Sequence, residues 1–292
     1  PRIAIRYASL HICMSVFIMP SSGPRIPRKP AGRYHHGDLR RALIDASLEL
    51  VRQRGPSGFT LAEICRAAGV SQAAPYRHFE GKDHVLAVAA SEGYQLLHAA
   101  MAGIAREPNQ LNETLERMAR AYLNFAIRHP AHLAVMFSHY PGDHFGGLLK
   151  EPNHGGPDGL KNLPPPQNQT EEAILASWHA GQAGFQALTQ AILTAAQGSP
   201  MAARINETTA SHYSAAIWSM VHGLAMLLLE RMIPPEWMQD DFKLAIELVV
   251  RPWINGLADM PTPVLSQMVN CPRLHMMGVQ LPALADPAHP AG

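Results

Sequence analysis

Residues 59–86 read FTLAEICRAAGVSQAAPYRHFEGKDHVL, and this stretch decides the fold of the N-terminal part of the chain. Thr60 stands three residues before Glu63, the spacing of a capping box, which predicts that a helix begins directly after Thr60. Gly69 can end this helix by adopting a positive φ, and a second helix is predicted over residues 71–78. Two short helices joined by a glycine turn form a helix-turn-helix, which presents its second helix to the major groove of DNA.

Apolar residues outside this stretch also recur at helical spacing. Leu39, Leu43 and Leu50 share one face of a helix that an Asp38 cap would start. No segment alternates convincingly at period two, so the predicted fold class is all-α. Pro252 is expected to kink or end the last helix. The predicted helices cover residues 38–54, 61–67, 71–78, 82–106, 111–128, 131–139, 171–197, 202–232 and 236–258.

Proline and glycine divide the chain into four parts. We expect a disordered arm over residues 1–33 and a three-helix DNA-binding domain with the helix-turn-helix over residues 34–84. A larger helical bundle for ligand binding and dimerisation is predicted over residues 85–259, with a long Gly- and Pro-rich loop at residues 141–169. The remaining residues, 260–292, are expected to form a disordered tail.

The charge is distributed unevenly along the chain. All 292 residues together carry a net charge of +1, but residues 25–82 hold eleven basic side chains against five acidic ones. Residues 83–292 hold eleven basic and eighteen acidic side chains. This asymmetry indicates a polyanionic partner for the basic part alone.

Several classes of protein are excluded or disfavoured. A hydrophobic content of 47% excludes a chain that is disordered throughout, and three well-separated cysteines indicate neither a disulfide framework nor a zinc site. The first twenty residues weakly imitate a signal peptide, but His11 interrupts the apolar run, so a misplaced start or cloned leader is favoured over export. The cysteine pattern fits a reducing cytoplasm, where we expect the protein to be located. The chain has no GxSxG, HExxH, phosphate-loop or dinucleotide motif, so we expect no enzyme and no cofactor.

Residues 42–86, which add ALIDASLELVRQRGPSG before the opening stretch, resemble the tetracycline-repressor (TetR) family of bacterial transcription regulators. The resemblance rests on a first helix ending in glycine, an aromatic residue before Thr60 and the pair Ala68–Gly69. It continues through the positions Tyr76, His78, Phe79, Lys82 and Leu86. The lead-in YHHGDLRRAL at residues 34–43 is similar to one branch of the family, and WSMVHG at residues 218–223 resembles a Trp-x-x-x-His-Gly motif of some TetR regulatory domains.

The resemblance implies DNA contacts at matching positions. Gln72 would bond adenine, and the methyl groups of Ala73 and Ala74 would pack on thymine methyls. Tyr76, His78 and Lys82 match phosphate-binding positions, Thr60 is a weaker candidate, and Arg77 could reach a phosphate or a guanine. Ser71 is expected to cap the recognition helix. The predicted DNA-binding residues are Thr60, Ser71, Gln72, Ala73, Ala74, Tyr76, Arg77, His78 and Lys82.

Pro75 departs from the family pattern, which has a branched apolar residue at this position. Proline removes one amide and clashes with the carbonyl four residues earlier, so the helix would begin late or run tight. Phe79 and Cys65 are interpreted as buried core residues. The basic residues of the N-terminal arm either follow the minor groove or form a solvated tail.

The apolar run AAIWSMVHGLAMLLL at residues 215–229 is shorter than the ~20 residues that span a bilayer, and we expect no membrane association. A helix that is apolar on all sides must be buried on all sides, which favours a second chain on one of its faces. The TetR resemblance implies a homodimer through the last two helices, and a double-stranded operator with inverted half-sites ~34–36 Å apart. The candidate dimer-interface residues are Trp218, Gly223, Leu227 and Trp253.

The TetR resemblance also implies that an unknown small-molecule effector enters a cavity among the middle helices and releases the regulator, a repressor by family default, from DNA. Apolar residues with few polar anchors suit such a pocket. His222 is either a ligand contact or a histidine in a packed seam, and the seam is favoured. The pocket candidates are Met118, Tyr122, Phe125, Met136, Trp178, Gln182, Phe185 and His222.

A metal-responsive DNA-binding regulator is the alternative hypothesis. His129, His132, His139 and His144 lie within sixteen residues, and the first pair is one helical turn apart. Pro130 breaks the spacing, however, and no cysteine is near. Surface histidines are therefore the favoured interpretation, and we assign no metal ligands.

Overall fold

The computed structural model describes residues 39–104, 107–138, 165–206 and 209–256. Regular structure in these ranges consists of helices alone, which confirms the all-α prediction. The predicted N-terminal arm, C-terminal tail and Asp38 cap, and most of the predicted 141–169 loop, lie outside the described residues.

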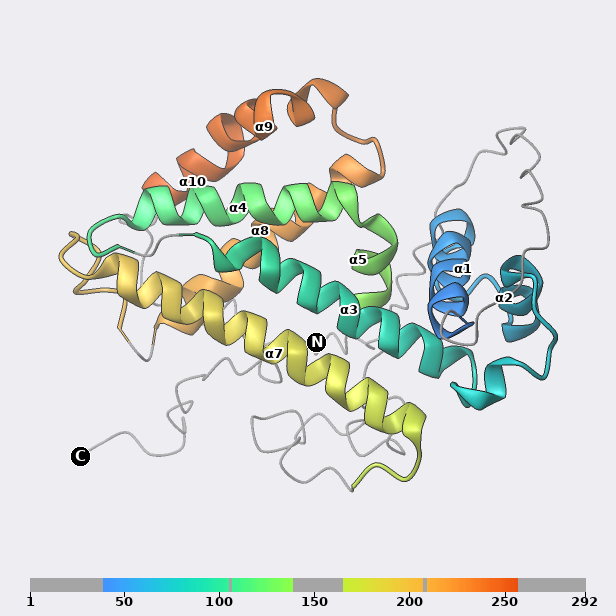
Figure 1. The fold of residues 1–292 in the computed structure, drawn as a ribbon. Coiled ribbons are helices and arrows are strands. Elements are labelled where there is room, and N and C mark those ends of the chain that lie inside the picture. Colours follow the sequence, from blue (N-terminus) through green and yellow to red (C-terminus); the bar gives the residue numbers. More distant parts are fainter. Residues whose placement is uncertain (1–38, 105–106, 139–164, 207–208, 257–292) are drawn as a thin grey trace, which may run out of the picture.

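Figure 1 shows the helices in two groups, with α1 and α2 at one end and a larger bundle beyond them. In chain order the elements are α1 (Leu39–Arg54), α2 (Leu61–Ala68), the 3-10 helix η1 (Pro75–Arg77), α3 (Lys82–Ala102), α4 (Leu111–Arg128), α5 (Pro130–Met136), α7 (Gln169–Ala196), α8 (Ala210–Leu229), the 3-10 helix η2 (Pro235–Met238), α9 (Gln239–Ala245), the π-helical turn η3 (Ile246–Val250) and α10 (Arg251–Gly256).

The predicted capping box begins α2. The amide of Glu63 donates to Thr60 Oγ1 over 3.3 Å, and the amide of Thr60 donates to Glu63 Oε2 over 2.9 Å. Gly69 ends the helix at φ +71°, a left-handed conformation that costs glycine little because it has no Cβ. Both sequence predictions at this helix are confirmed.

The first hydrophobic core joins α1 and α2 to the start of α3. It includes Ile44, Ile64 and Phe79, each fully or almost fully buried, as was predicted for Phe79. Leu86 of α3 also belongs to this core, so the proposed domain boundary at residues 84–85 falls inside α3. One continuous helix therefore leads from the small group of helices into the bundle (Figure 1).

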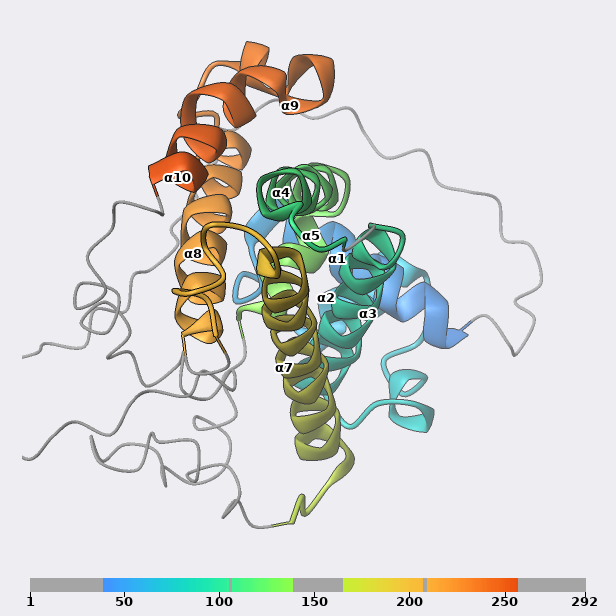
Figure 2. The same ribbon diagram turned by 90° about the vertical axis from the view of Figure 1, so that its left-hand side faces the viewer.

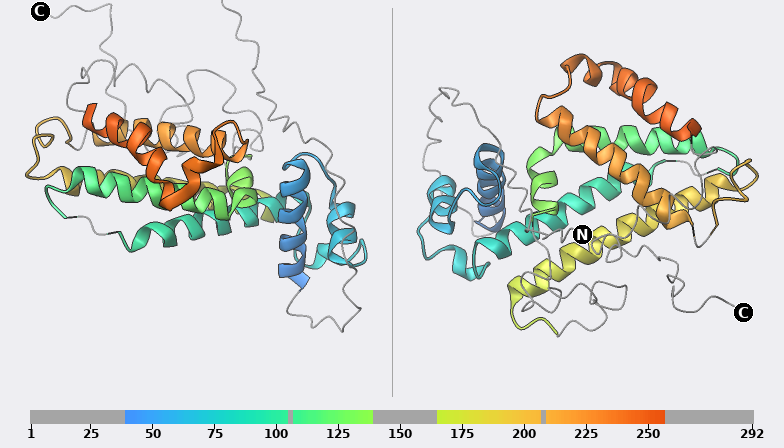
Figure 3. Two further views of the ribbon diagram at one scale, coloured as in Figure 1. Left: turned by 90° about the horizontal axis from the view of Figure 1, so that it is seen from above. Right: turned by 180° about the vertical axis from the view of Figure 1, so that it is seen from behind.

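The second core lies among α4, α7, α8 and the segment from α9 to α10. α7 packs along α3, and α8 packs against both α4 and α7, as Figure 3 shows from above and from behind. α5 serves both cores, because Val135 belongs to the first core while Leu133 and Met136 belong to the second. A rigid-body movement of one group against the other must therefore repack α5.

The prediction of one continuous helix over residues 236–258 is wrong. Asp240, Asp241 and Phe242 adopt left-handed φ angles of 47°, 54° and 61°. Phe242 is buried in the second core, and Asn124 of α4 donates to Asp241 Oδ1 over 2.7 Å, so tertiary contacts hold this unusual backbone in place. The helix then widens into the π-helical turn η3 just before Pro252 and continues through this proline in α10, so Pro252 does not end it.

The helix predicted over residues 202–232 begins later, at Ala210. Asn206 and Thr209 stop it from starting sooner, because the amide of each donates to the side-chain oxygen of the other, over 3.0 and 3.1 Å. Among the described helices, α8 alone has the length and hydropathy to cross a bilayer, but half of its most apolar window is buried within the chain. The other predicted boundaries agree within four residues, apart from residues 71–78.

Candidate functional site

The prediction of an α-helix over residues 71–78 is wrong in its type and extent. The chain there makes turns that lead into the single 3-10 turn η1. Pro75 explains the difference, because it has no amide to donate to the Ser71 carbonyl and its ring would clash with that carbonyl in an α-helix. The amides of Ala74 and His78 instead donate three residues back, over 3.1 and 2.8 Å. The expectation that proline makes this helix run tight is confirmed.

This recognition segment, residues 71–79, is exposed along most of its length and anchored at two points. Pro75 and Phe79 are buried, whereas Tyr76 is 65% exposed. The N-cap of η1 is Ala74, with no side-chain cap, so the expected cap from Ser71 is not formed. Among the other predicted contact residues of the segment, the exposed ones are Gln72, Ala73 and Arg77, and the half-buried ones are Ala74 and His78. The segment can therefore offer an amide, a phenol and a guanidinium to a partner.

Lys82 has an intramolecular role beside this segment. Its Nζ donates to the backbone carbonyls of Pro56 and Phe59 over 3.3 and 3.2 Å, and it lies 5.3 Å from the centroid of the Phe59 ring. Thr60 is also engaged, because its hydroxyl takes part in the capping box with Glu63. These two predicted phosphate contacts therefore already stabilise the turn between α1 and α2.

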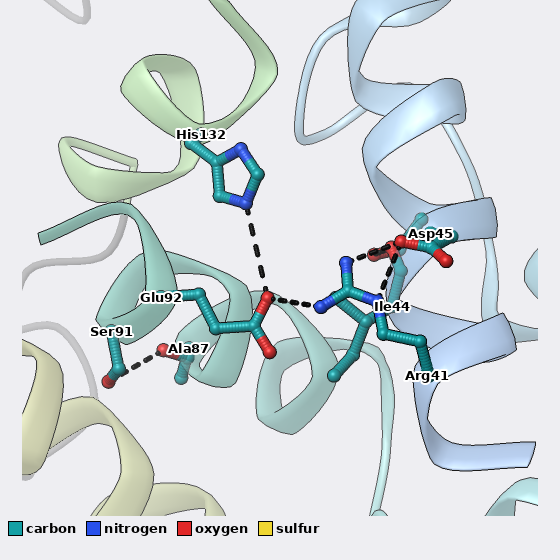
Figure 4. Close-up of polar contacts among 8 residues, drawn as sticks. Arg41, Ile44, Asp45, Ala87, Ser91, Glu92 and His132 are labelled. Atoms are coloured by element: carbon teal, nitrogen blue, oxygen red, sulfur yellow. Dashed lines mark hydrogen bonds and ion pairs between the residues drawn. The ribbon is translucent and has the colours of Figure 1, made fainter. Parts of the chain in front are cut away.

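Figure 4 shows a polar junction between the two groups of helices. Arg41 of α1 donates to Glu92 of α3 over 2.9 Å and to Asp45 over 2.8 Å. The same Glu92 oxygen lies 4.0 Å from Nε2 of His132 on α5. Asp45 and Glu92 raise the pKa of Arg41, whereas burial and the neighbouring His129 lower the pKa of His132. Part of the basic charge of α1 is thus neutralised within the chain.

Glu80 connects the end of the recognition segment to the start of α7. Its carboxylate accepts from the amide and hydroxyl of Thr170 over 2.8 and 2.7 Å, and from the amide of Gln169 over 3.2 Å. The bonds from Thr170 lower the pKa of Glu80, and a negative charge at a helix N-terminus is favourable. Asn168 provides a second cap, because its Oδ1 accepts from the amide of Glu171 over 2.9 Å.

A cavity of about 100 Å³ lies in the bundle, between α3, α4, α7 and α8. Three of the predicted pocket residues line it, namely Met118, Tyr122 and Phe185. Four others are not among the lining residues, namely Phe125, Met136, Trp178 and Gln182. Phe125 and Met136 are buried in the second core instead. A stripe of aromatic residues on a helix does not by itself distinguish these two environments.

One group of lining residues that the sequence prediction missed comes from α3. Tyr94, Leu97, His98 and Met101 are spaced by three, one and three residues, so they share one face of the helix. This periodicity was present in the sequence and would have indicated an inward face. Gly184 of α7 was also missed, because a glycine carries no signal for the space beside it.

His222 lies in a packed aromatic seam beside the cavity, in keeping with the favoured interpretation. Its Nδ1 is 2.7 Å from the hydroxyl of Tyr122, and its ring stacks on Trp218 with centroids 5.3 Å apart. Phe137 meets the same imidazole edge-on at 4.8 Å. Trp218, expected at a dimer interface, lines the cavity. The resemblance of this segment to a Trp-His-Gly regulatory domain stays a prediction.

One buried and two half-buried histidines predict that the fold is sensitive to mild acid. Burial lowers the pKa of His84, His132 and His222, so the unfolded chain takes up protons first as the pH falls through about 6.5. Their contribution to stability is complete above that pH and declines below it, towards the folded-state pKa values. We expect the melting temperature to decrease as the pH is lowered from about 7.5 to 5.5. The decrease should be smaller in the double variant His132→Asn, His222→Asn. Equal slopes would contradict this assignment.

The metal hypothesis has no support in the described part of the chain. No group of three His, Cys, Asp or Glu side chains there is arranged to hold a metal ion. His129 and His132 have ring centroids 5.7 Å apart, but no third ligand completes a site. His139 and His144 lie outside the described residues.

Comparison with known proteins agrees with this geometry. Residues 43–89 match the family model described as bacterial regulatory proteins of the tetR family. Residues 115–251 match the model of a tetracyclin repressor-like C-terminal domain. The two models together cover more than half of the chain, one on each group of helices.

Similar sequences and structures come from several bacteria. The chain is 47% identical over 60 residues to the HTH-type transcriptional regulator SrpR of Pseudomonas putida, which is 20% of this chain and 28% of SrpR. It is 45% identical over 47 residues to the HTH-type regulator BetI of Brucella anthropi, 16% of this chain and 24% of BetI. The chain thus matches about a quarter of the length of these curated relatives.

The fold has a counterpart in a crystal structure from Pseudomonas aeruginosa PAO1, described as that of a transcriptional regulator. The alignment has 16% identity and a TM-score of 0.50, and it covers 80% of this chain and 96% of that one. This likeness concerns the fold alone. The family matches on both groups of helices, together with the capped helix α2 and its exposed recognition segment, establish that the chain belongs to the TetR family of DNA-binding transcriptional regulators.

Proposed function

We propose that this regulator binds an inverted-repeat operator as a homodimer, represses transcription there, and releases the DNA when a small molecule fills the cavity in the bundle. The observation that carries the proposal is the exposed recognition segment, which Phe79 anchors in the first core and in which Pro75 is also buried. An exposed segment on a rigid base can enter a groove without a large loss of conformational entropy. Its side chains are of the types that bond base edges and phosphates.

Within the recognition segment we assign base reading to Gln72 and phosphate binding to Tyr76 and His78. Gln72 precedes η1 and is exposed, so its amide is free to approach the N6 and N7 atoms of adenine. Arg77 is also exposed and can reach either a phosphate or a guanine. Lys82 supports the turn beneath these residues, and its ammonium group can bind a phosphate from that position.

The surface that we assign to the dimer interface is formed by α8 and the segment from α9 to α10. Figure 2 shows these elements on the same side of the bundle. Seven large hydrophobic residues are exposed in the described part of the chain, and four belong to these elements or their connection: Leu227, Met232, Leu244 and Leu248. Gly223 is exposed and a Cβ there would meet no atom within 4 Å, so a second helix can approach α8 closely. Trp253 is half-buried at the edge of the second core.

We assign the transmission of effector binding to α7. Its middle residues, including Gly184 and Phe185, line the cavity, and its first residues bond to Glu80 beside the recognition segment. A straight helix of 28 residues transmits a displacement at one end to the other. An effector can lower operator affinity by no more than its preference for the displaced arrangement.

Selection of binding sites from random DNA tests the proposal. We expect a palindromic consensus, and a loss of affinity at every sequence in Tyr76→Ala, because phosphate contacts carry no sequence information. Gln72→Ala is the matched change in the same segment. It should alter the preference at one position of each half-site, by about 1–3 kcal/mol, with little effect elsewhere. An unchanged preference would overturn the assignment of base reading to Gln72.

A further inference from the structure

The walls of the cavity contain no acidic side chain, lysine or arginine that could pair with an ionic ligand. None of its eighteen lining residues is Asp, Glu, Lys or Arg. The hydroxyl of Tyr94 donates to the carbonyl of Met136 over 3.0 Å, and that of Tyr122 pairs with His222. His98 also lines the cavity, and its side chain reaches solvent. The two phenols are thus already partnered within the chain.

Aromatic rings form a large part of these walls. Tyr94, Tyr122, Phe137, Phe185 and Trp218 come from four different elements of the bundle and from the end of α5. Phe137 contacts both neighbours, with ring centroids 6.4 Å from Tyr94 and 5.9 Å from Trp218. A ligand in this cavity would therefore exchange water for ring faces and edges, which favours apolar and aromatic groups.

The size of the cavity limits the ligand. About 100 Å³ is below the ~300–1,000 Å³ of pockets for drug-sized molecules, and closer to an engineered cavity of ~150 Å³ that holds benzene. A single aromatic ring with small substituents is therefore the upper limit for an aromatic ligand enclosed in this volume. An anion in such walls would have no oppositely charged partner, and a cation would gain only contacts with ring faces, which do not offset the loss of its hydration.

We propose that the effector of this regulator is an uncharged compound with the size and apolar character of one substituted aromatic ring. The inference rests on the proposed function, because it names the chemical class of the ligand that the cavity takes. A polar substituent of the ligand could form a hydrogen bond with the Tyr122 hydroxyl, which would exchange its bond to His222 for one to the ligand.

Two glycines of α7 show where the cavity can be filled. A Cβ at Gly181 would lie 2.9 Å from Tyr94 Cζ, so this glycine allows the phenol ring to pack against the helix. A Cβ at Gly184 would meet nothing within 4 Å, although Gly184 lines the cavity. Gly184→Leu therefore places a side chain in the ligand's space without a backbone clash, and Gly184→Ala fills a smaller part of it.

Calorimetric titration of the full chain with three probes of similar shape tests the inference. The probes are 4-ethylphenol, which is neutral, 4-ethylbenzoate, which is an anion, and (4-methylphenyl)trimethylammonium, which is a cation. We expect 4-ethylphenol to bind about tenfold or more tightly than either ion. Gly184→Leu should weaken its binding about tenfold or more, and Gly184→Ala should have a smaller effect. Gly103→Leu is the control, because Gly103 is exposed and its Cβ would also meet nothing within 4 Å.

An ion that binds as tightly as 4-ethylphenol overturns the inference, as does an absence of 4-ethylphenol binding or equal binding by Gly184→Leu and the control. If Gly184→Leu fails to fold, the affinity of Gly184→Ala for 4-ethylphenol tests the inference instead, and a thermal melt checks that this variant is folded. Operator titration with and without 4-ethylphenol separates this inference from the proposed function. Binding of the phenol with no change in operator affinity leaves the ligand class standing and contradicts effector release. Operator binding without binding of 4-ethylphenol contradicts the ligand class and leaves the proposed DNA binding standing.

Discussion

Replacement of Leu248 by glutamate should abolish high-affinity operator binding. Leu248 is 56% exposed on η3, within the surface formed by α8 and the segment from α9 to α10. A carboxylate there would be buried without a partner in a dimer, which disfavours association strongly. A monomer contacts only one half-site, so we expect operator affinity to fall by about 100-fold or more. Sedimentation of the variant and fluorescence anisotropy with the selected operator measure the two effects.

Leu96→Glu is the matched control for this variant. Leu96 is 38% exposed on α3, outside the proposed interface, and it is not among the residues that line the cavity. It receives the same chemical change, so any general effect of added negative charge on DNA binding appears in both variants. A Leu248→Glu protein that sediments as a dimer would show that the chain associates through another surface, or that this surface tolerates the charge.

Replacement of Glu80 by alanine should leave operator affinity nearly unchanged and remove most of the effector's influence on it. The Glu80 carboxylate, directly after the recognition segment, accepts hydrogen bonds from Gln169 and Thr170 at the N-terminus of α7. Allosteric coupling commonly changes affinity by about 5–150-fold. In Glu80→Ala we expect the ratio of operator affinities, measured without and with 4-ethylphenol, to fall towards one.

Asn168→Ala separates coupling from helix capping. Asn168 caps the same helix through the amide of Glu171, but this bond does not reach the recognition segment. The variant should lose a comparable amount of helix stability while keeping the effector ratio. If both variants lose the ratio equally, the stability of the first turn of α7, and not the link from Glu80, controls the response.

Local sequence signals predicted the first group of helices well, because they involve residues close in the chain. The capping box of Thr60 and Glu63 and the left-handed Gly69 need only a few neighbouring atoms to form. Pro75 showed that the recognition helix would be disturbed, but not how far. The 3-10 turn that forms there leaves Pro75 and Phe79 buried, and the place of Phe79 in the first core could not be located from the neighbouring residues alone.

The cavity was only partly predictable, because its walls come from four helices and α5. Met118, Tyr122 and Phe185 were assigned to it from their chemistry, while the equally aromatic Phe125 went to the core. The rotation of each helix about its axis decides this difference, and that rotation depends on every helix packed against it. The spacing of Tyr94 and Met101 indicates an inward face of α3, but the sequence does not show which helices that face meets.

The sequence by itself determined the all-α class and the two ends of α2, because capping, turn chemistry and helical periodicity act between residues a few positions apart, and its resemblance to known regulators indicated the family. The tertiary structure alone decided that α5 would serve both cores, that Glu80 would meet the N-terminus of α7, and that Trp218 would line a cavity. Those contacts join residues far apart in the chain. Their geometry follows from how the helices pack, and helix packing is set by the whole molecule at once.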